Sequence, residues 1–171
     1  MSEANGSGSI DALVAELAEG RAAFRAALDD VDPALLTTPG LVGEWSAREL
    51  VAHLGYWDGH AADALHAAED GRTAEFDAEG LDVEARNATV ARVAAASDFE
   101  TVRSREEASF EALLDRLRDA DPSWLFQRTA SGDTVEQVVR EDGADHYREH
   151  AADIRAWFAE GTLEDGAGDE D

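Results

Sequence analysis

Residues 44–54 read Glu44-Trp45-Ser46-Ala47-Arg48-Glu49-Leu50-Val51-Ala52-His53-Leu54. Ser46 is followed three residues later by Glu49, and this spacing predicts a capping box at the start of a helix. The apolar stretch that follows places His53 two turns into that helix. A histidine among apolar residues is costly to bury unless a partner satisfies its ring nitrogens. We therefore expect His53 either to be hydrogen-bonded in the core or to act as a ligand.

The sequence around this helix predicts its end and the helix before it. Asp70-Gly71 supplies a stop, so the helix is expected to end near Glu69. Nearer the N-terminus, Ser9 is expected to cap a first helix, because apolar residues then recur at three- and four-residue steps as far as Leu28. Prolines and glycines between residues 31 and 45 predict a loop that joins the two helices.

Two further helical segments are expected in the second half of the chain. One runs from about Asp82 to Asp119 with a break at Ser97-Asp98, and the other runs from Thr134 to about Glu160. Thr134 and Gln137 form a second capping box at the start of the last segment. No stretch alternates apolar and polar residues as a strand does. The predicted class is all-α, a four-helix bundle whose third helix is long or broken.

The charge of the chain excludes several classes of partner. The 171 residues include 39 acidic and 14 basic side chains, all of the latter Arg, which gives a formal charge of −25. Such a charge repels phosphate backbones and anionic lipids, so we expect neither nucleic acid nor a membrane as partner. We expect the acids to occupy the tail and the outer helix faces, away from the histidines.

The domain plan follows from the same composition. Residues 1–8 are expected to be a disordered N-terminal segment, 9–161 the bundle, and 162–171 an acidic disordered tail. Cysteine is absent, which excludes disulfides and thiolate nucleophiles from the chain itself. The chain shows no signal-peptide pattern and no apolar run long enough to span a bilayer, so a cytoplasmic location is expected.

Three of the five histidines have the spacing of a metal site. His146 and His150 lie one turn apart on the same face of the last helix. Together with His53 from a second helix they would offer three neutral nitrogen ligands and leave a position open for substrate. Taken alone, His53 could be a hydrogen-bonded core residue, and His146 with His150 could be a solvated pair, because both arrangements are common. Helix lengths favour an antiparallel arrangement of the second and last helices, with the connection after Asp70 as the crossover.

Other residues are candidates to surround this site. His60 lies about 10 Å along the helix from His53, too far to share a metal, and is expected to line the pocket or be partly exposed. Asp142 could orient His146 or act as a base, although most acids are solvated. Trp57 and Trp157 could wall an apolar pocket, with core packing as the alternative. His66 is expected to be solvated.

Taken together, these motifs resemble the DinB/YfiT-like superfamily. The resemblance lies in the run from Trp45 through Ser46 and Glu49 to His53, and in His146-Tyr147-Arg148-Glu149-His150 followed by Ile154 and Trp157. Asn87 at the start of the third helix is also similar to the family pattern. The resemblance implies a bundle with up-down-down-up topology and a long crossover between helices 2 and 3. It also implies a divalent metal held by His53, His146 and His150, with zinc or nickel expected and iron or manganese as alternatives.

The family resemblance suggests a function and leaves alternatives open. Members include thiol-dependent enzymes such as mycothiol-dependent maleylpyruvate isomerase and bacillithiol transferases. We therefore expect a metal-dependent enzyme that activates water or an external low-molecular-weight thiol on a small molecule, either as a hydrolase or as a thiol transferase or isomerase. The alternatives are a metal-free small-molecule-binding or resistance protein similar to the colibactin self-resistance group, and a non-enzymatic binding bundle. The resemblance also suggests a homodimer. The sequence shows no exposed apolar stripe that would form its interface.

Overall fold

The structure, a computed structural model, describes residues 3–165, and within this range it contains helices and no strand. The all-α class is therefore confirmed. Its elements in chain order are α1 (Glu3–Asp29), η1 (Pro33–Leu35), α2 (Ala47–Glu69), η2 (Thr73–Glu75), α3 (Val83–Ala95), α4 (Phe99–Arg118), η3 (Pro122–Phe126), α5 (Val135–Val139), the π-helical η4 (Arg140–Asp145) and α6 (His146–Asp165).

Both ends of the helical region lie beyond the expected bounds. Because α1 begins at Glu3, Ser9 lies inside the helix and is not its N-cap; its hydroxyl instead lies 3.5 Å from the Glu136 carboxylate. The last helix continues past Gly161 to Asp165. A helix propagates at the gain of one hydrogen bond per residue once it is nucleated, so weak helix formers can extend it. The remaining parts of the two expected disordered segments, residues 1–2 and 166–171, lie outside the described residues.

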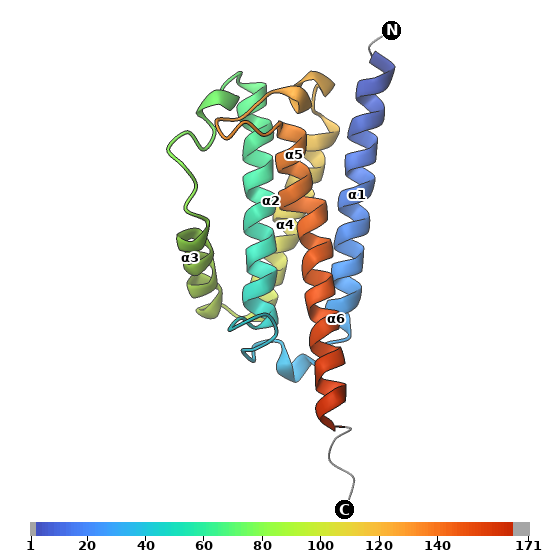
Figure 1. The fold of residues 1–171 in the computed structure, drawn as a ribbon, viewed down its shortest axis with the longest axis vertical. Coiled ribbons are helices and arrows are strands. Elements are labelled where there is room, and N and C mark those ends of the chain that lie inside the picture. Colours follow the sequence, from blue (N-terminus) through green and yellow to red (C-terminus); the bar gives the residue numbers. More distant parts are fainter. Residues whose placement is uncertain (1–2, 166–171) are drawn as a thin grey trace, which may run out of the picture.

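Four long helical rods make up the body of the molecule (Figure 1). In that view α1 runs downward and α2 upward, and then α4 runs upward while α5, η4 and α6 run downward. The α2 helix packs against α4, and α1 packs against α6. The connection from α2 to α4 returns along the bundle by way of α3, which lies outside the four rods against α2.

The two predicted capping boxes are present and fix where α2 and α5 begin. At α2 the backbone N–H of Ser46 donates to Oε2 of Glu49 at 2.8 Å, within the expected capping box. At α5 the N–H of Thr134 donates to Oε1 of Gln137, also at 2.8 Å. The expected break is present too, because the Asp98 carboxylate caps a new helix, α4. Side-chain acceptors thus satisfy N–H groups that the first helical turn leaves unpaired.

The core is formed by the apolar faces of the four rods. The largest side chains with almost no exposed surface come from α1, α2, α4, η3 and α6, and include Leu13, Leu17, Phe24, Leu50, Leu54, Leu65, Leu113, Leu117, Leu125, Tyr147 and Ile154. Burial of this apolar surface is the main favourable contribution to the folding free energy. The apolar residues whose spacing predicted α1 all face this core. Four of them are buried, Ile10, Leu13, Leu17 and Phe24, and two are half-buried, Val14 and Leu28.

One segment of the last rod departs from the expected regular helix. Residues Arg140–Asp145 form a π-helical turn between α5 and α6. Its buried residues are Gly143 and Ala144, four and five positions after the buried Val139. Such π-helical turns are frequent at functional sites. Here the turn immediately precedes His146.

Close backbone packing holds this π-helical turn against α1. A Cβ atom added at Gly20 would lie 2.7 Å from the backbone oxygen of Ala144, a separation that real Cβ atoms do not show. Gly143, in turn, lies directly against the side chain of Leu17. The absence of side chains at these two glycines therefore allows α1 and η4 to approach each other.

A buried polar network joins the four rods at mid-height. Arg21 of α1 donates from Nε and a terminal nitrogen to the two carboxylate oxygens of Glu106 of α4, at 2.7 and 2.8 Å. The Tyr147 hydroxyl of α6 lies 2.6 Å from Glu106 and 2.5 Å from Oδ2 of Asp58 of α2. Burial raises the pKa of Asp58 well above its usual value. A protonated Asp58 can then donate to Tyr147, which donates to Glu106.

Candidate metal centre

His53, His146 and His150 come together where α2 faces the start of α6. One ligand atom from each lies within 4.8 Å of the others. The Nε2 atoms of His53 and His146 are 2.7 Å apart, and the ring centroids of His53 and His150 are 5.2 Å apart. The structure therefore brings together the three residues that the spacing had grouped, from two helices that run in opposite directions (Figure 1).

The surroundings of His53 and His146 keep these two rings neutral. Burial, and then the charges of His146 and His150, lower the pKa of His53 to about 3. Burial, followed by the charge of His150, lowers the pKa of His146 to about 4. Neutral imidazoles offer a lone pair, which is the form that binds a metal ion. At neutral pH His53 and His146 are thus uncharged nitrogen donors.

Hydrogen bonds on the far sides of two rings fix which nitrogen carries the proton. The Nδ1 atom of His146 lies 3.3 Å from the backbone oxygen of Asp142, and Nδ1 of His150 lies 2.8 Å from the Asp153 carboxylate. Both partners accept, so in each ring Nδ1–H donates and Nε2 is left with its lone pair. Such outer partners are usual around metal-binding histidines.

The remaining ring, His53, has one nitrogen that nothing satisfies. Its Nδ1 is buried and has no hydrogen-bond partner among the described residues. Its Nε2 faces the unprotonated Nε2 of His146. Two such lone pairs repel each other unless a proton or a cation lies between them. The donor set therefore fits a divalent ion of the kind that imidazole ligands hold.

Aromatic rings pack on both sides of His53. The Trp45 ring centroid lies 4.9 Å from that of His53 and the Trp57 centroid 6.3 Å from it. The indole N–H of Trp57 donates to Oδ1 of Asn87 on α3 at 3.0 Å, which holds this ring in place. Trp57 thus lines the site as expected, and Trp45 is a wall residue that had been read only as part of the helix-start motif.

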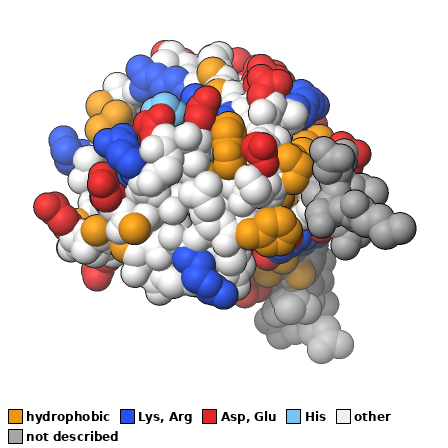
Figure 2. Space-filling model, turned by 90° about the horizontal axis from the view of Figure 1, so that it is seen from above, with side chains coloured by type: hydrophobic (Ala, Val, Ile, Leu, Met, Phe, Trp, Pro, Cys, Tyr) orange, Lys and Arg blue, Asp and Glu red, His pale blue; other side chains and the backbone are white. Residues whose placement is uncertain are grey.

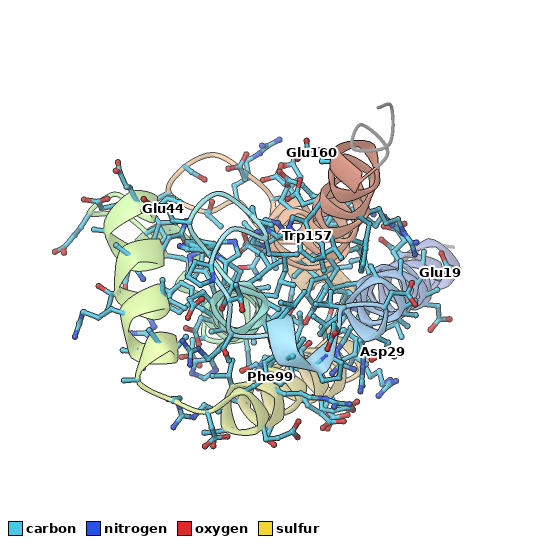
Figure 3. The ribbon with its side chains drawn as sticks, turned by 90° about the horizontal axis from the view of Figure 1, so that it is seen from below. Glu19, Asp29, Glu44, Phe99, Trp157 and Glu160 are labelled. Carbon is cyan, nitrogen blue, oxygen red and sulfur yellow. The ribbon has the colours of Figure 1, made fainter. Side chains whose placement is uncertain are left out.

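A cavity of about 880 Å³ opens beside the three histidines. It is lined by α2, the crossover between α2 and α3, the loop at residues 129–133, and η4. Trp157 is not among its lining residues; its ring packs against Phe158 at 5.0 Å, on the part of α6 nearer the C-terminus (Figure 3). The expectation that Trp157 walls the pocket is therefore not met, because it lies two turns beyond His150.

His60 lines the cavity and is not part of the three-histidine cluster. Its Nδ1 lies 2.6 Å from Asp142 and its Nε2 lies 2.8 Å from Asp77. Burial opposes the charged form, but the bonds and charges of the two carboxylates outweigh it and raise the pKa of His60. His66, by contrast, is exposed on the outer face of α2, as expected.

The role expected of Asp142 changes with this contact. Its carboxylate faces His60, and only its backbone oxygen reaches His146. The reason is His60, which lies opposite on α2 and binds the Asp142 carboxylate at 2.6 Å. Asp142 therefore touches the metal-ligand candidate through its main chain, and no carboxylate–imidazole bond joins the two side chains.

The acidic charge also reaches the site, contrary to expectation. Five carboxylates line the cavity: Asp77, Asp133, Glu141, Asp142 and Glu149. The end of the bundle seen from above exposes acidic, Arg and hydrophobic side chains next to one another (Figure 2). The acids are therefore not confined to the outer faces of the bundle.

Comparisons with known proteins give one family and one solved structure. The family model described as mycothiol maleylpyruvate isomerase N-terminal domain matches residues 17–155. The crystal structure of the mycothiol-dependent maleylpyruvate isomerase superimposes with a TM-score of 0.68 at 20% sequence identity, over 85% of this chain and 60% of that one. The present chain thus spans about 60% of that protein's length. At this identity the similarity shows a shared fold. No curated protein matches.

In the part of the chain that the structure describes, no helix is both long and apolar enough to cross a membrane.

Proposed function

Because this chain belongs to the mycothiol maleylpyruvate isomerase N-terminal domain family, we propose that it is a thiol-dependent enzyme of the isomerase or transferase type. The observation that carries this proposal is the set of three convergent histidines at the wall of a cavity of about 880 Å³. The chain has no cysteine, so the reacting thiol is an external cosubstrate. Mycothiol, which the name of the solved relative includes, is the first thiol to test.

We propose that His53, His146 and His150 hold a divalent ion, with zinc or nickel expected. The support is the donor set itself, in which the Nε2 atoms of His53 and His146 lie 2.7 Å apart and the opposite nitrogens of His146 and His150 are held by acceptors. A dication bound by neutral ligands keeps its full charge and lowers the pKa of a thiol beside it.

The other residues of the site have positioning roles in this proposal. The Asp142 carbonyl and the Asp153 carboxylate orient the rings of His146 and His150. Trp45 and Trp57 pack on His53 and limit the access of water to it. We propose Asp142 as a positioning residue, because its carboxylate is bound to His60 and is therefore not free to take a proton from substrate.

The alternatives receive less support. Nothing in the family match or the structural match favours a hydrolase. A metal-free binding bundle, whether a resistance protein or a non-enzymatic one, would leave three convergent imidazoles, those of His53 and His146 neutral, without a role. The up-down-down-up topology is part of the proposal and is supported by the chain directions in Figure 1. A cytoplasmic location and a homodimer remain predictions.

The test is a thiol assay with the purified chain. Mycothiol is mixed with an electrophilic cis-alkene such as maleamide, and two readouts are followed with zinc-loaded and with chelator-treated protein: loss of free thiol, which a transferase causes, and conversion of maleamide to fumaramide, in which an isomerase adds the thiol and then releases it. The proposal predicts that at least one of the two exceeds its uncatalysed rate with zinc and falls back to that rate in His53→Ala, whereas the exposed control His66→Ala stays active. Both readouts at their uncatalysed rates in all samples, across several low-molecular-weight thiols, would contradict it.

A further inference from the structure

We infer that the cavity beside the three histidines takes a neutral or cationic acceptor and excludes dianions such as maleylpyruvate. This inference deepens the proposed function and rests on it for the identity of the site. It concerns which small molecules the cavity admits, and it is based on the charged and apolar residues of the lining.

The lining is strongly unbalanced in charge. It contains five carboxylates, and among the described residues no Arg lines it. Glu141 shows how closely the acids gather, because burial and the neighbouring charges of Asp133, Asp142 and Asp145 raise its pKa. A substrate carboxylate entering this space would meet carboxylates on more than one side.

The one cationic side chain in the lining is already engaged. His60 donates from both ring nitrogens, to Asp142 at 2.6 Å and to Asp77 at 2.8 Å. It therefore has no N–H left for a substrate carboxylate. One imidazolium among five carboxylates leaves about four negative charges, and a dication at the histidines would offset about half of these.

Arginines close to the lining in sequence are also bound elsewhere. Arg140 donates to Glu16 and Glu136 at 3.0 and 3.1 Å. Arg128 donates to the backbone oxygen of Gly132 at 2.6 Å, and Arg148 lies 3.3 Å from Asp145. Arg86, next to the lining residue Asn87, donates to the Tyr56 hydroxyl at 2.6 Å. Carboxylate recognition commonly uses a guanidinium in a bidentate pair, and among the described residues no guanidinium belongs to the lining.

The rest of the lining indicates what would bind instead. Trp45, Trp57, Phe76, Leu81 and Val83 give the cavity an apolar wall in addition to the acids. The carboxylates can accept hydrogen bonds from hydroxyl, amide or ammonium groups, and aromatic faces also attract cations. The class of acceptor is therefore a partly apolar electrophile that carries hydroxyl, amide or amine groups.

The inference is tested by binding, separately from catalysis. The two probes are phenylsuccinate, a dianion, and phenylsuccinamide, its neutral analogue, titrated into the zinc-loaded full chain with tryptophan fluorescence as readout. We expect the neutral probe to bind at least tenfold more tightly. Equal or tighter binding of phenylsuccinate overturns the inference, including binding that depends on His53 and therefore on direct ligation. Absence of binding by both probes also overturns it, because the apolar wall is then not a binding surface.

Variants assign the selectivity to the cavity. Asp133→Asn with Glu141→Gln removes two lining charges, and we expect the affinity for phenylsuccinate to rise severalfold with little change for phenylsuccinamide. The matched control Glu107→Gln with Glu111→Gln removes two exposed charges of α4, and should change neither affinity. An equal rise in the control would mean that net charge alone is responsible. If the probes behave as expected but no thiol reaction occurs, the proposed function fails while the charge selectivity stands.

Discussion

The Nδ1 atom of His60 lies 2.6 Å from Oδ2 of Asp142, so a histidine of α2 holds the π-helical turn that presents His146. The same ring binds Asp77 of the crossover on its other side. His60, which is not one of the three clustered histidines, thus helps to hold in place the segment that carries His146. The predictions below begin with that contact.

The first prediction is a pH-dependent contribution of His60 to stability. Its pKa is raised above 6.5 in the folded protein, so the stabilisation is fully present below pH 6.5 and is lost as pH rises through the raised value. His60→Gln should therefore lower the free energy of unfolding by more at pH 6 than at pH 9. Urea denaturation at the two pH values measures this difference.

A matched variant controls for other titrating groups. His53 and His146 titrate in both the wild type and His60→Gln, so their contribution cancels in the difference. For the exposed control His66→Gln, the free energy of unfolding should stay close to that of the wild type at both pH values. A loss in His60→Gln that is the same at pH 6 and pH 9 would mean that the imidazolium is not what holds the two carboxylates.

The second prediction concerns the buried pair of Arg21 and Glu106. Glu106→Leu alone leaves an uncompensated buried guanidinium and should cost about 3–5 kcal/mol. The double variant Arg21→Met with Glu106→Leu replaces both charges by apolar groups and should recover most of that loss. Chemical denaturation of the single and double variants measures both values. A double variant that is less stable than Glu106→Leu alone would contradict this account of the network.

The third prediction uses two glycines within helices. Gly20→Ala places a Cβ 2.7 Å from the backbone oxygen of Ala144 and should cost about 1–3 kcal/mol, because neither helix backbone yields easily. Gly59→Ala, in α2, meets nothing within 4 Å and should stabilise by about 0.5–1 kcal/mol. Melting temperatures should therefore shift in opposite directions. A shift of the same sign in both variants would contradict close packing of α1 on η4.

Much of the fold follows from local signals in the sequence. The apolar spacing of α1 and the capping residues of α2, α4 and α5 are local, so they predict the helices and the break at Ser97-Asp98. The grouping of His53 with His146 and His150 was also accessible, because one-turn spacing and an inward position are properties of single helices. Local signals could not predict which side chains of different segments meet in the folded chain.

The missed features all depend on such tertiary geometry. The π-helical turn Arg140–Asp145 has no local signal in the sequence, and within it the Asp142 carboxylate is bound to His60 of another helix. The inward acids were missed because loops and η4 bring them together from distant positions. The sequence did offer a signal for Trp45, which immediately precedes the capping box of the helix that carries His53. In the structure its ring packs on His53.

The central claim is that His53, His146 and His150 hold a divalent ion, and metal analysis tests it most directly. The chain is purified without chelators, incubated with zinc or nickel and desalted, and its metal content is measured by mass spectrometry. The account predicts close to one ion per chain in the wild type and in His66→Ala, and loss of that ion in His53→Ala and His150→Ala. A wild type that retains no ion, or variants that retain as much as the wild type, would contradict it.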